Sequence, residues 1–226
     1  DVGAQVALLD RDIDKARDLA AKLSANGCHA QAFACDVSQE ASVQQAAQAV
    51  QERFGTVWGL VNNAGFLRSA SLSEVTLADW NAVLAVNLTG YLLVARALAQ
   101  HMPEGGSIVN VASIAGLAGN PSEMKTIAYN TSKGAVINFT RALAGEWGEH
   151  GITVNAICPG FFPSKMTHGL LEKLGADKMA QGAPLRRLGD DEDLKGLALL
   201  FASDAGKHIT GQWMAVDGGV SAIIGG

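Results

Sequence analysis

Residues 5–27 read QVALLDRDIDKARDLAAKLSANG and contain the two patterns that decide the fold. The first block, 5–9, is apolar after its first residue and shows no alternation, as expected of a strand that is covered on both faces in a parallel sheet. From Ile13 to Leu23 apolar side chains recur at helical spacing, and the pair Asn26–Gly27 supplies a stop. This stretch therefore predicts one strand followed by one amphipathic helix.

The same alternation of strands and helices continues along the rest of the chain. Regular alternation implies right-handed crossovers and predicts an α/β fold with a doubly wound parallel sheet. No internal repeat or linker marks a second domain, so we expect a single domain over residues 1–226. The expected strands are 5–9, 30–34, 59–62, 107–111, 152–157 and 212–216, and the expected helices are 13–23, 41–54, 77–101 and 129–150, with a helical pair at 164–203.

Composition limits the possible classes of function. Of the 226 residues 48% are apolar and 17% are charged, which excludes intrinsic disorder. The net charge is −5 and the longest basic run is Arg186–Arg187, so no nucleic-acid partner is expected. No segment approaches about 20 continuous apolar residues, and the three cysteines form no Cys-x-x-Cys pair, as is typical of a reducing compartment. We therefore expect a cytoplasmic protein with no membrane partner and, since no histidine has metal-ligand spacing, no metal site.

Ligands of doubly wound sheets bind outside the carboxyl ends of the strands, so the residues after each strand are the first candidates. These residues are polar or expose the backbone: Asp10, Asp36 and Val37, Asn62 to Gly65, Ser113, and Pro159 with Gly160. Asp10 is suited to accept hydrogen bonds from the ribose hydroxyls of an adenosine, and its charge would repel a 2′-phosphate, which favours NAD over NADP. An equally good interpretation is that Asp10 caps the following helix.

Tyr129 and Lys133 are the sharpest pair of candidates. They lie four residues apart at the start of a helix, so their side chains share one face. An ammonium group beside a phenol favours the phenolate and lowers its pKa from about 10 toward the working range of an acid–base catalyst. Taken alone, such a pair is more commonly an ordinary surface pair.

Ser113 and Asn87 complete this set. Ser113 follows a buried strand and is placed to donate a hydrogen bond to a substrate carbonyl oxygen and to stabilise charge that develops there. The alternative for Ser113 is a simple turn at the end of the strand. Asn87 lies inside the apolar stretch 83–93 and needs hydrogen-bond partners, and its alternative is a satisfied core amide.

Taken together, several motifs resemble the short-chain dehydrogenase/reductase family, and the resemblance covers the chain from end to end. It implies a Rossmann-type fold and reversible hydride transfer between NAD or NADP and a carbonyl or secondary alcohol. It also implies a homodimer or homotetramer built on the two long helices that contain Asn87 and Tyr129. The motifs are NNAG at 62–65, VNLTG around Asn87, VASIAG around Ser113, YNTSK at 129–133, PG at 159–160, ITGQ at 209–212 and VDGG at 216–219.

The resemblance also implies a role for each matching residue. Tyr129 would be the catalytic acid or base, and Lys133 would lower its pKa and hold the nicotinamide ribose. Ser113 would polarise the substrate oxygen, and Asn87 would hold a water in the proton relay. The implied cofactor-binding residues are Asp36 and Val37 at the adenine, Asn62, Ala64 and Gly65 along the adenine-ribose side, Tyr129 and Lys133 themselves, and Pro159, Gly160 and Ser164 at the nicotinamide amide.

The sequence departs from the family's pattern at one place. The family's opening strand and its Thr-Gly-x-x-x-Gly-x-Gly loop, which cradles a pyrophosphate, are absent, and no other glycine loop replaces them. The absent strand would lie between the strand at Val6 and the strand at Leu60, so we expect two unpaired interior edges. We also expect the sequence to be a fragment of a longer natural chain.

The loops around the predicted substrate site, 116–129, 159–167 and 184–189, resemble the branch of gluconate 5-dehydrogenase-like and 3-oxoacyl-reductase-like enzymes. We expect a polyol, a sugar acid or a similar small hydroxy compound as substrate. Reduction of a 3-oxoacyl thioester on an acyl carrier protein is the alternative, and it would need a cationic patch. The candidates for that patch are Lys165, Arg186, Arg187 and Lys195. An alternative of another class is a noncatalytic binding or assembly subunit.

Overall fold

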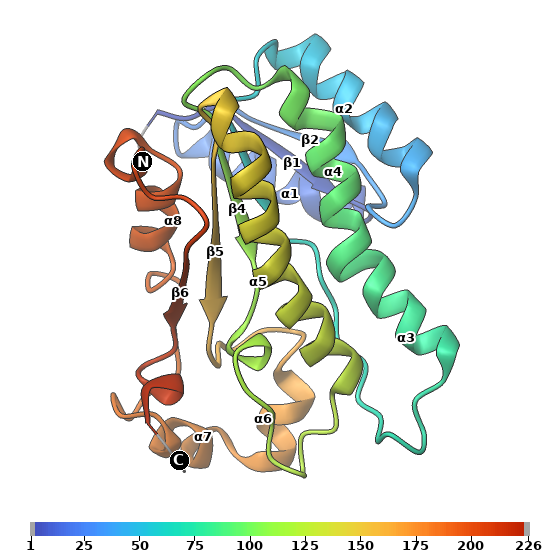
Figure 1. The fold of residues 1–226 in the computed structure, drawn as a ribbon, viewed down its shortest axis with the longest axis vertical. Coiled ribbons are helices and arrows are strands. Elements are labelled where there is room, and N and C mark those ends of the chain that lie inside the picture. The colour runs from blue at the N-terminus through green and yellow to red at the C-terminus, as the bar shows by residue number, and fades with distance from the viewer. Residues whose placement is uncertain (1–2, 224–226) are drawn as a thin grey trace.

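The computed structural model describes residues 3–223 and confirms the α/β fold (Figure 1). The expectation of one domain over residues 1–226 extends beyond the described residues at both ends. The strands are β1 (Val6–Asp10), β2 (Ala30–Ala34), β3 (Gly59–Asn62), β4 (Ser107–Val111), β5 (Thr153–Pro159) and β6 (Trp213–Val216). The helices are α1 (Ile13–Ala25), α2 (Glu40–Phe54), α3 (Leu77–Leu84), α4 (Gly90–Leu98), α5 (Ile127–Trp147), α6 (His168–Leu174), α7 (Ala176–Gly182) and α8 (Lys195–Phe201).

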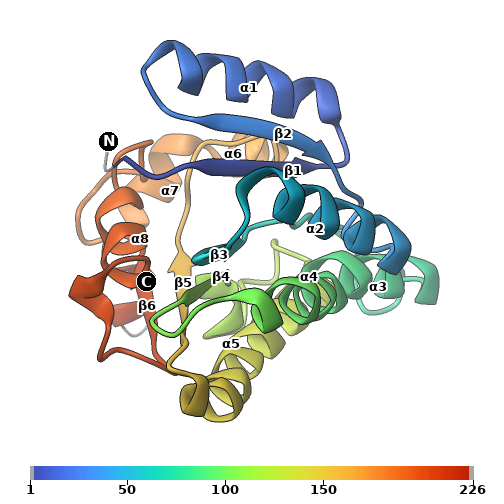
Figure 2. The same ribbon diagram turned by 90° about the horizontal axis from the view of Figure 1, so that it is seen from above.

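All strand pairs are parallel, but they form two sheets, one of β1 and β2 and one with the order β3-β4-β5-β6. Figure 2 shows β1 and β2 as a separate layer with α1 outside it. Within residues 3–223 no strand pairs with the facing edges of β1 and β3. The parallel architecture is thus confirmed, with the sheet divided where the sequence predicted two unpaired interior edges.

Helices cover both faces of the larger sheet. Ile108 and Val109 are neighbours in β4, so their side chains point to opposite faces. Ile108 lies in a buried cluster with residues of α4 and α5, which run side by side over one face (Figure 1). Val109 lies in a second buried cluster with Leu197 and Phe201 of α8 on the other face. The central strands β4 and β5 are therefore buried on both faces, whereas the outer strands β3 and β6 keep exposed residues.

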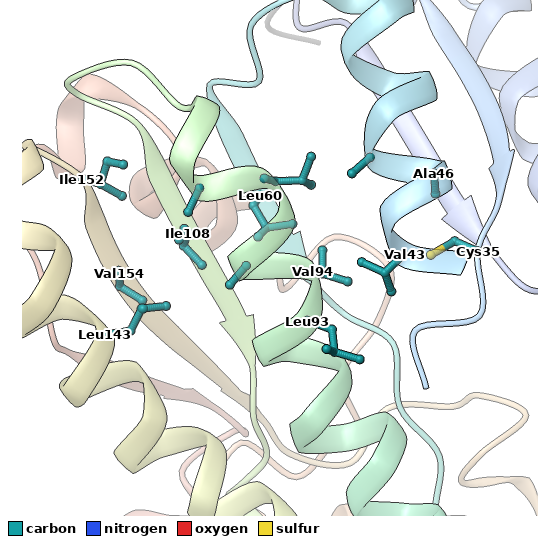
Figure 3. Packing of buried hydrophobic residues seen from close by; sticks show 14 of the residues in the cluster. Cys35, Val43, Ala46, Leu60, Leu93, Val94, Ile108, Leu143, Ile152 and Val154 are labelled. Carbon is teal, nitrogen blue, oxygen red and sulfur yellow. The ribbon is translucent and has the colours of Figure 1, made fainter. Parts of the chain in front are cut away.

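One buried hydrophobic cluster spans the two sheets (Figure 3). It contains Cys35, which follows β2, and Val43 of α2, together with Leu93 of α4 and Ile108 of β4. Helix α2 packs directly against α4. Since no strand pairing joins the sheets in the described part of the chain, this apolar helix contact holds them together.

A chain of buried polar side chains links the larger sheet to α5. The amide nitrogen of Asn62 donates to Oδ1 of Asn110 at 2.9 Å, and Asn110 donates to the hydroxyl of Thr140 at 3.0 Å. The Thr140 hydroxyl donates in turn to the carbonyl oxygen of Val136 at 2.8 Å. All three side chains are buried. Satisfied networks of this kind fix one arrangement of their elements, because any other leaves a buried group unpaired.

Residues 77–101 form one continuous helical segment, as expected, in which α3 and α4 are joined by a π-helical turn, Ala85–Thr89. By length and mean hydropathy alone this segment is a candidate membrane span, although polar residues such as Asp79, Asn87 and Arg96 interrupt it. Val83 and Tyr91 on this segment are almost fully buried within the protein. The burial identifies it as a core helix, because half of its most apolar window is covered inside the fold.

The helical pair expected at 164–203 is wrong, since the structure has three short helices there. Helices α6 and α7 are separated by Gly175, which has a φ of 85°. Glycine adopts this positive φ readily, and the conformation ends helix α6. A nonhelical segment at 183–194 then precedes α8. Helical spacing of apolar residues did not reveal these two interruptions.

The asparagine network predicts a stability effect. In Asn110→Ala the buried Asn62 amide loses its acceptor, so the free energy of unfolding should fall by about 1–3 kcal/mol. Chemical denaturation measures this. Asn138→Ala, at an exposed position of α5, is the control and should change stability little. Equal losses in both variants would show that the network contributes no more than an exposed amide.

Candidate active site

Lys133 lies in the second turn of α5, and only 3% of it is exposed. Its Nζ donates to the carbonyl oxygen of Val111 at 2.6 Å and to the hydroxyl of Tyr91 at 3.4 Å. It also lies 5.8 Å from the ring centre of Tyr129 and 5.4 Å from that of Tyr91. Tyr129 and Lys133 are therefore not an ordinary surface pair, because the ammonium group is inside the protein.

A short turn after β4 holds Ser113 against α5. The Ser113 hydroxyl accepts from the backbone N–H of Ala115 at 3.1 Å and begins the turn Ile114–Gly116. A β-carbon at Gly116 would lie 2.5 Å from the backbone carbonyl carbon of Lys133, so glycine is required for this close approach. The Ser113 side chain also interacts with the phenol of Tyr129. Ser113 thus both forms a turn at the end of the strand and contacts the candidate acid.

Asn87 lies in the π-helical turn and is fully buried. Its side chain accepts from the backbone N–H of Phe66 and donates to the carbonyl oxygen of Phe66, each at 3.0 Å. It also donates to the hydroxyl of Ser132 at 3.0 Å. The Asn87 amide therefore joins the helix of residues 77–101, the loop after β3 and α5. Single-turn π insertions often occur at functional sites, where they shift the register of a helix.

Burial favours the uncharged forms of both Tyr129 and Lys133. It raises the pKa of Tyr129, and the Ser113 side chain opposes this in part. It lowers the pKa of Lys133 to about 8, with a smaller opposite influence from Cys158. The expectation that Lys133 lowers the pKa of Tyr129 is therefore wrong for this structure. Loss of water dominates the pKa of both groups, and Lys133 directs its hydrogen bonds to Val111 and Tyr91 instead.

The carboxyl ends of β1 and β2 bring Asp10 and Asp36 to the same edge, where the N–H of Cys35 donates to the Asp10 carbonyl oxygen at 3.0 Å. Helix α1 is capped by Asp12, which accepts from the backbone N–H of Lys15. The capping role considered for Asp10 therefore belongs to Asp12. Asp10 Oδ1 accepts from the N–H of Asp12 at 2.8 Å. Its other oxygen has no partner in the described part of the chain.

The segment Asp36–Val37 lies directly against the helix that carries Asn87. The Asp36 carboxylate accepts from the backbone N–H and the hydroxyl of Ser38 at 2.9 and 2.6 Å, which hold its pKa below the usual range. A β-carbon at Gly90 would lie 2.9 Å from a methyl carbon of Val37. Glycine at the first position of α4 thus allows the candidate adenine contacts to pack three residues from Asn87.

The three candidates at the end of β3 and in the loop after it have different environments. Asn62 is buried and uses its amide in the network with Asn110, so this side chain serves the fold. A β-carbon at Gly65 would lie 3.4 Å from Asn87 Oδ1 and 3.5 Å from Lys133 Nζ, in contact with both. Gly65 therefore lies next to both groups and places no side chain between them. Ala64, which lies between Asn62 and Gly65 in the sequence, is partly buried.

The Pro159–Gly160 turn packs against the VDGG segment. Gly160 donates to the carbonyl oxygen of Val216 at 2.9 Å, and a β-carbon at Gly160 would lie 2.6 Å from that of Asp217. Ser164 is exposed, and its hydroxyl is 2.9 Å from that of Thr167. Among the described residues no hydrogen bond joins Ser164 to Tyr129 or Lys133. The structure therefore brings Asn87, Ser113, Tyr129 and Lys133 together. Ser164 forms no hydrogen bond with any of them.

Two residues of the site were missed from the sequence. Tyr91 contacts Lys133, and Ser132 accepts from Asn87 while its own hydroxyl donates to the Tyr129 carbonyl oxygen at 2.7 Å. Tyr91 is one of only two tyrosines in the chain and follows Asn87 by four residues, which is a usable signal. Ser132 carries no such signal, because a serine before Lys133 is unremarkable by type and spacing.

Comparison with known proteins agrees with this arrangement. Residues 1–221 match the family described as "Enoyl-(Acyl carrier protein) reductase". The chain is 38% identical over 229 residues to 2-(S)-hydroxypropyl-CoM dehydrogenase 3 of Xanthobacter autotrophicus, covering 98% of this chain and 88% of the relative. It is 38% identical over 203 residues to the 3-oxoacyl-[acyl-carrier-protein] reductase of Synechocystis, covering 88% and 79%. The crystal structure of a gluconate 5-dehydrogenase from Burkholderia cenocepacia, in complex with NADP and tartrate, is 33% identical with a TM-score of 0.92, covering 98% and 87%.

The fold, the site and these matches define a nicotinamide-dependent oxidoreductase that acts on CH–OH groups. Within that class, the chain belongs to the short-chain dehydrogenase/reductase family. The resemblance to gluconate 5-dehydrogenase-like and 3-oxoacyl-reductase-like members is confirmed as well.

The pKa of Lys133 predicts a pH-dependent contribution to stability. Between its folded pKa of about 8 and its ordinary value of 10.5, the unfolded chain holds the proton and the folded chain does not, so the contribution rises with pH. From pH 7 to pH 9 the free energy of unfolding of the wild type, relative to Lys133→Met, should rise by about 1 kcal/mol. Denaturant titrations at the two pH values measure this difference.

Lys173→Met on α6 is the matched control, because this exposed side chain keeps its water in the folded protein. Its difference from the wild type should stay constant between the two pH values. A constant difference for Lys133→Met as well would contradict burial as the cause of its altered titration.

Proposed function

We propose that this chain catalyses reversible hydride transfer between a nicotinamide cofactor and a carbonyl or secondary alcohol at Tyr129. The observation that carries the proposal is the meeting of Ser113, Tyr129 and Lys133, with Lys133 next to Gly65, which has no side chain. A raised pKa keeps the Tyr129 phenol protonated at neutral pH, so it holds the proton that a carbonyl oxygen accepts on reduction. Ser113 donates a hydrogen bond to that oxygen and stabilises its developing charge.

Lys133 and Asn87 support these two residues. Lys133 presents a buried donor group beside Tyr129, where it holds the nicotinamide ribose. Asn87 takes part in the proton relay through a water. Its side-chain amide is already engaged by Phe66 and Ser132, so its backbone atoms are the ones left to hold that water.

The residues present fit both ends of a nicotinamide cofactor. At the nicotinamide end, Gly65 places no side chain beside Lys133 Nζ, and Tyr129 and the Pro159–Gly160 turn are the other residues proposed for this end. The adenine end is formed by Asp10, Asp36 and Val37, with Asn62 and Ala64 between the ends, and Ser164 contributes at the amide. The cofactor supplies the hydride, and the protein supplies position and protons. The unpartnered oxygen of Asp10 can accept a hydrogen bond from a ribose hydroxyl, which supports a preference for NAD over NADP. The second carboxylate, at Asp36, adds to the repulsion of a 2′-phosphate.

A small hydroxy compound, such as a polyol or a sugar acid, is the proposed substrate. The gluconate 5-dehydrogenase from Burkholderia supports this by its similarity. The alternative, a 3-oxoacyl thioester on an acyl carrier protein, is supported by the Synechocystis relative. It needs a patch of free cations, yet Arg187 pairs with Asp193, Lys195 pairs with Glu192, and Arg186 donates to a backbone carbonyl oxygen. Lys165 is exposed and has no ion pair within residues 3–223, but one cation does not make a patch. The small substrate is therefore favoured.

We further propose that the chain acts as one cofactor-binding domain in the cytoplasm, in a homodimer or homotetramer. Leu92 on α4 is 47% exposed, and an apolar side chain on one of the two long helices supports a contact between copies there. A noncatalytic subunit is the alternative of another class. Such a subunit would show no turnover with either cofactor, and this distinguishes it from the enzyme in the experiments below.

Tyr129→Phe tests the proposed reaction. The variant keeps the ring and loses the proton donor, so turnover should fall by at least about 100-fold, as for loss of a general acid. NADH binding, measured by fluorescence titration, should change little because the ring still lines the site. Turnover equal to that of the wild type would remove Tyr129 from the role of acid.

Asp10→Ala tests the cofactor preference. Removing the charge removes the repulsion of a 2′-phosphate, so the ratio of the NADPH and NADH dissociation constants should fall toward one. Fluorescence titration with both cofactors measures the ratio. Asp14→Ala, an exposed acid on α1, is the control for a simple change in net charge. An unchanged ratio in Asp10→Ala would leave the preference to other residues.

A further inference from the structure

Tyr91 is a buried polar residue that the proposed reaction does not use. It lies on α4, only 1% of it is exposed, and it packs in a cluster with Val136 and Cys158. A phenylalanine would fill the same volume without needing a hydrogen-bond partner. The hydroxyl group is therefore the feature that calls for an explanation.

The Tyr91 hydroxyl, the Lys133 ammonium group and the Val111 carbonyl form a closed set of hydrogen bonds. The hydroxyl donates to the Val111 oxygen at 3.0 Å. This leaves the hydroxyl oxygen as an acceptor, and Lys133 Nζ donates to it at 3.4 Å while also donating to the Val111 oxygen at 2.6 Å. Three elements, α4, β4 and α5, thus meet at one ammonium group.

The groups around Nζ leave Lys133 without a counter-ion. The titratable groups that face it are Tyr91 from α4, Tyr129 from α5 and Cys158 from β5. Burial raises the pKa of all three, so they are neutral near pH 7. Asp217, after β6, acts on Cys158. Within residues 3–223 no carboxylate forms an ion pair with Lys133, so neutral acceptors must stabilise its charge.

We propose that Tyr91 is a positioning residue for catalysis, whose hydroxyl anchors the Lys133 ammonium group and leaves one N–H for the space beside Gly65. This inference rests on the role proposed above for Lys133. Nζ lies 3.5 Å from where a β-carbon of Gly65 would be, so the remaining N–H has access to that space. Anchoring by a neutral hydroxyl, rather than by a carboxylate, keeps the ammonium charge available to the site.

Tyr91→Phe is the decisive variant, because it keeps the ring near Lys133 and removes only the hydroxyl. Losing one acceptor of ordinary strength should lower the midpoint of the Lys133 titration by about half a pH unit. Carbon-13 NMR of labelled lysine side chains measures that midpoint, with the Lys133 signal assigned by its loss in Lys133→Met. In the same variant kcat at pH 7 should fall about 2- to 10-fold, and the alkaline limb of the pH profile should move to lower pH.

Ser107→Ala is the control. It removes another buried hydroxyl, which donates to the Phe201 carbonyl oxygen and does not contact Lys133. Its Lys133 titration and pH profile should equal those of the wild type. If Tyr91→Phe fails to fold, Tyr91→Met, whose flexible side chain fills the core, should show the same shift.

An unchanged Lys133 titration in the folded Tyr91 variants would overturn the inference and leave Tyr91 a packing residue. The NMR titration needs no turnover, so it tests Tyr91 even if Tyr129→Phe were to remove the proposed function. A shift in the titration together with unchanged kinetics would also overturn the positioning role.

Discussion

The carbonyl oxygen of Val111 is the point on which the site depends. It ends β4 and accepts hydrogen bonds from Lys133 of α5 and Tyr91 of α4. A backbone carbonyl at the end of a parallel strand has a lone pair that the ladder does not use. By accepting from two buried side chains, it sets how far each helix lies from the sheet, and so it fixes the depth at which the lysine is held.

That depth is possible only where the backbone comes unusually close. Gly116 lets the turn after β4 pack on the backbone of Lys133, and Gly90 lets Val37 pack on the start of α4. A side chain at either position would separate elements that carry the site. The two glycines thus allow the elements to approach closely, and the Val111 carbonyl orients the side chains that donate to it. Together they bring residues from four segments into contact.

The sequence predicted the elements better than it predicted their contacts. Apolar blocks and helical spacing located β2, β3 and β4 to the residue, and the polar residues after the strands included Ser113 and Asp36. The burial of Lys133 and its partner Tyr91 could not be predicted, because both depend on how closely α4, α5 and β4 approach. The prediction of a lowered pKa for Tyr129 was wrong for the same reason, because the spacing of two side chains does not determine how much water surrounds them.

Because the sheet is divided, helix packing sets the relative position of its two parts, which strand pairing usually sets. Within the described residues β1 and β3 share no hydrogen bond, so the position of Asp36 relative to Asn87 depends on α2 packing against α4 and on the contact of Val37 with Gly90. The helical segment 77–101 therefore contacts Val37 at Gly90 and contacts residues of α5 through Asn87 and Tyr91, on either side of Gly90. Because one rigid element touches both, a change in the packing of α4 acts on both ends of the site at once.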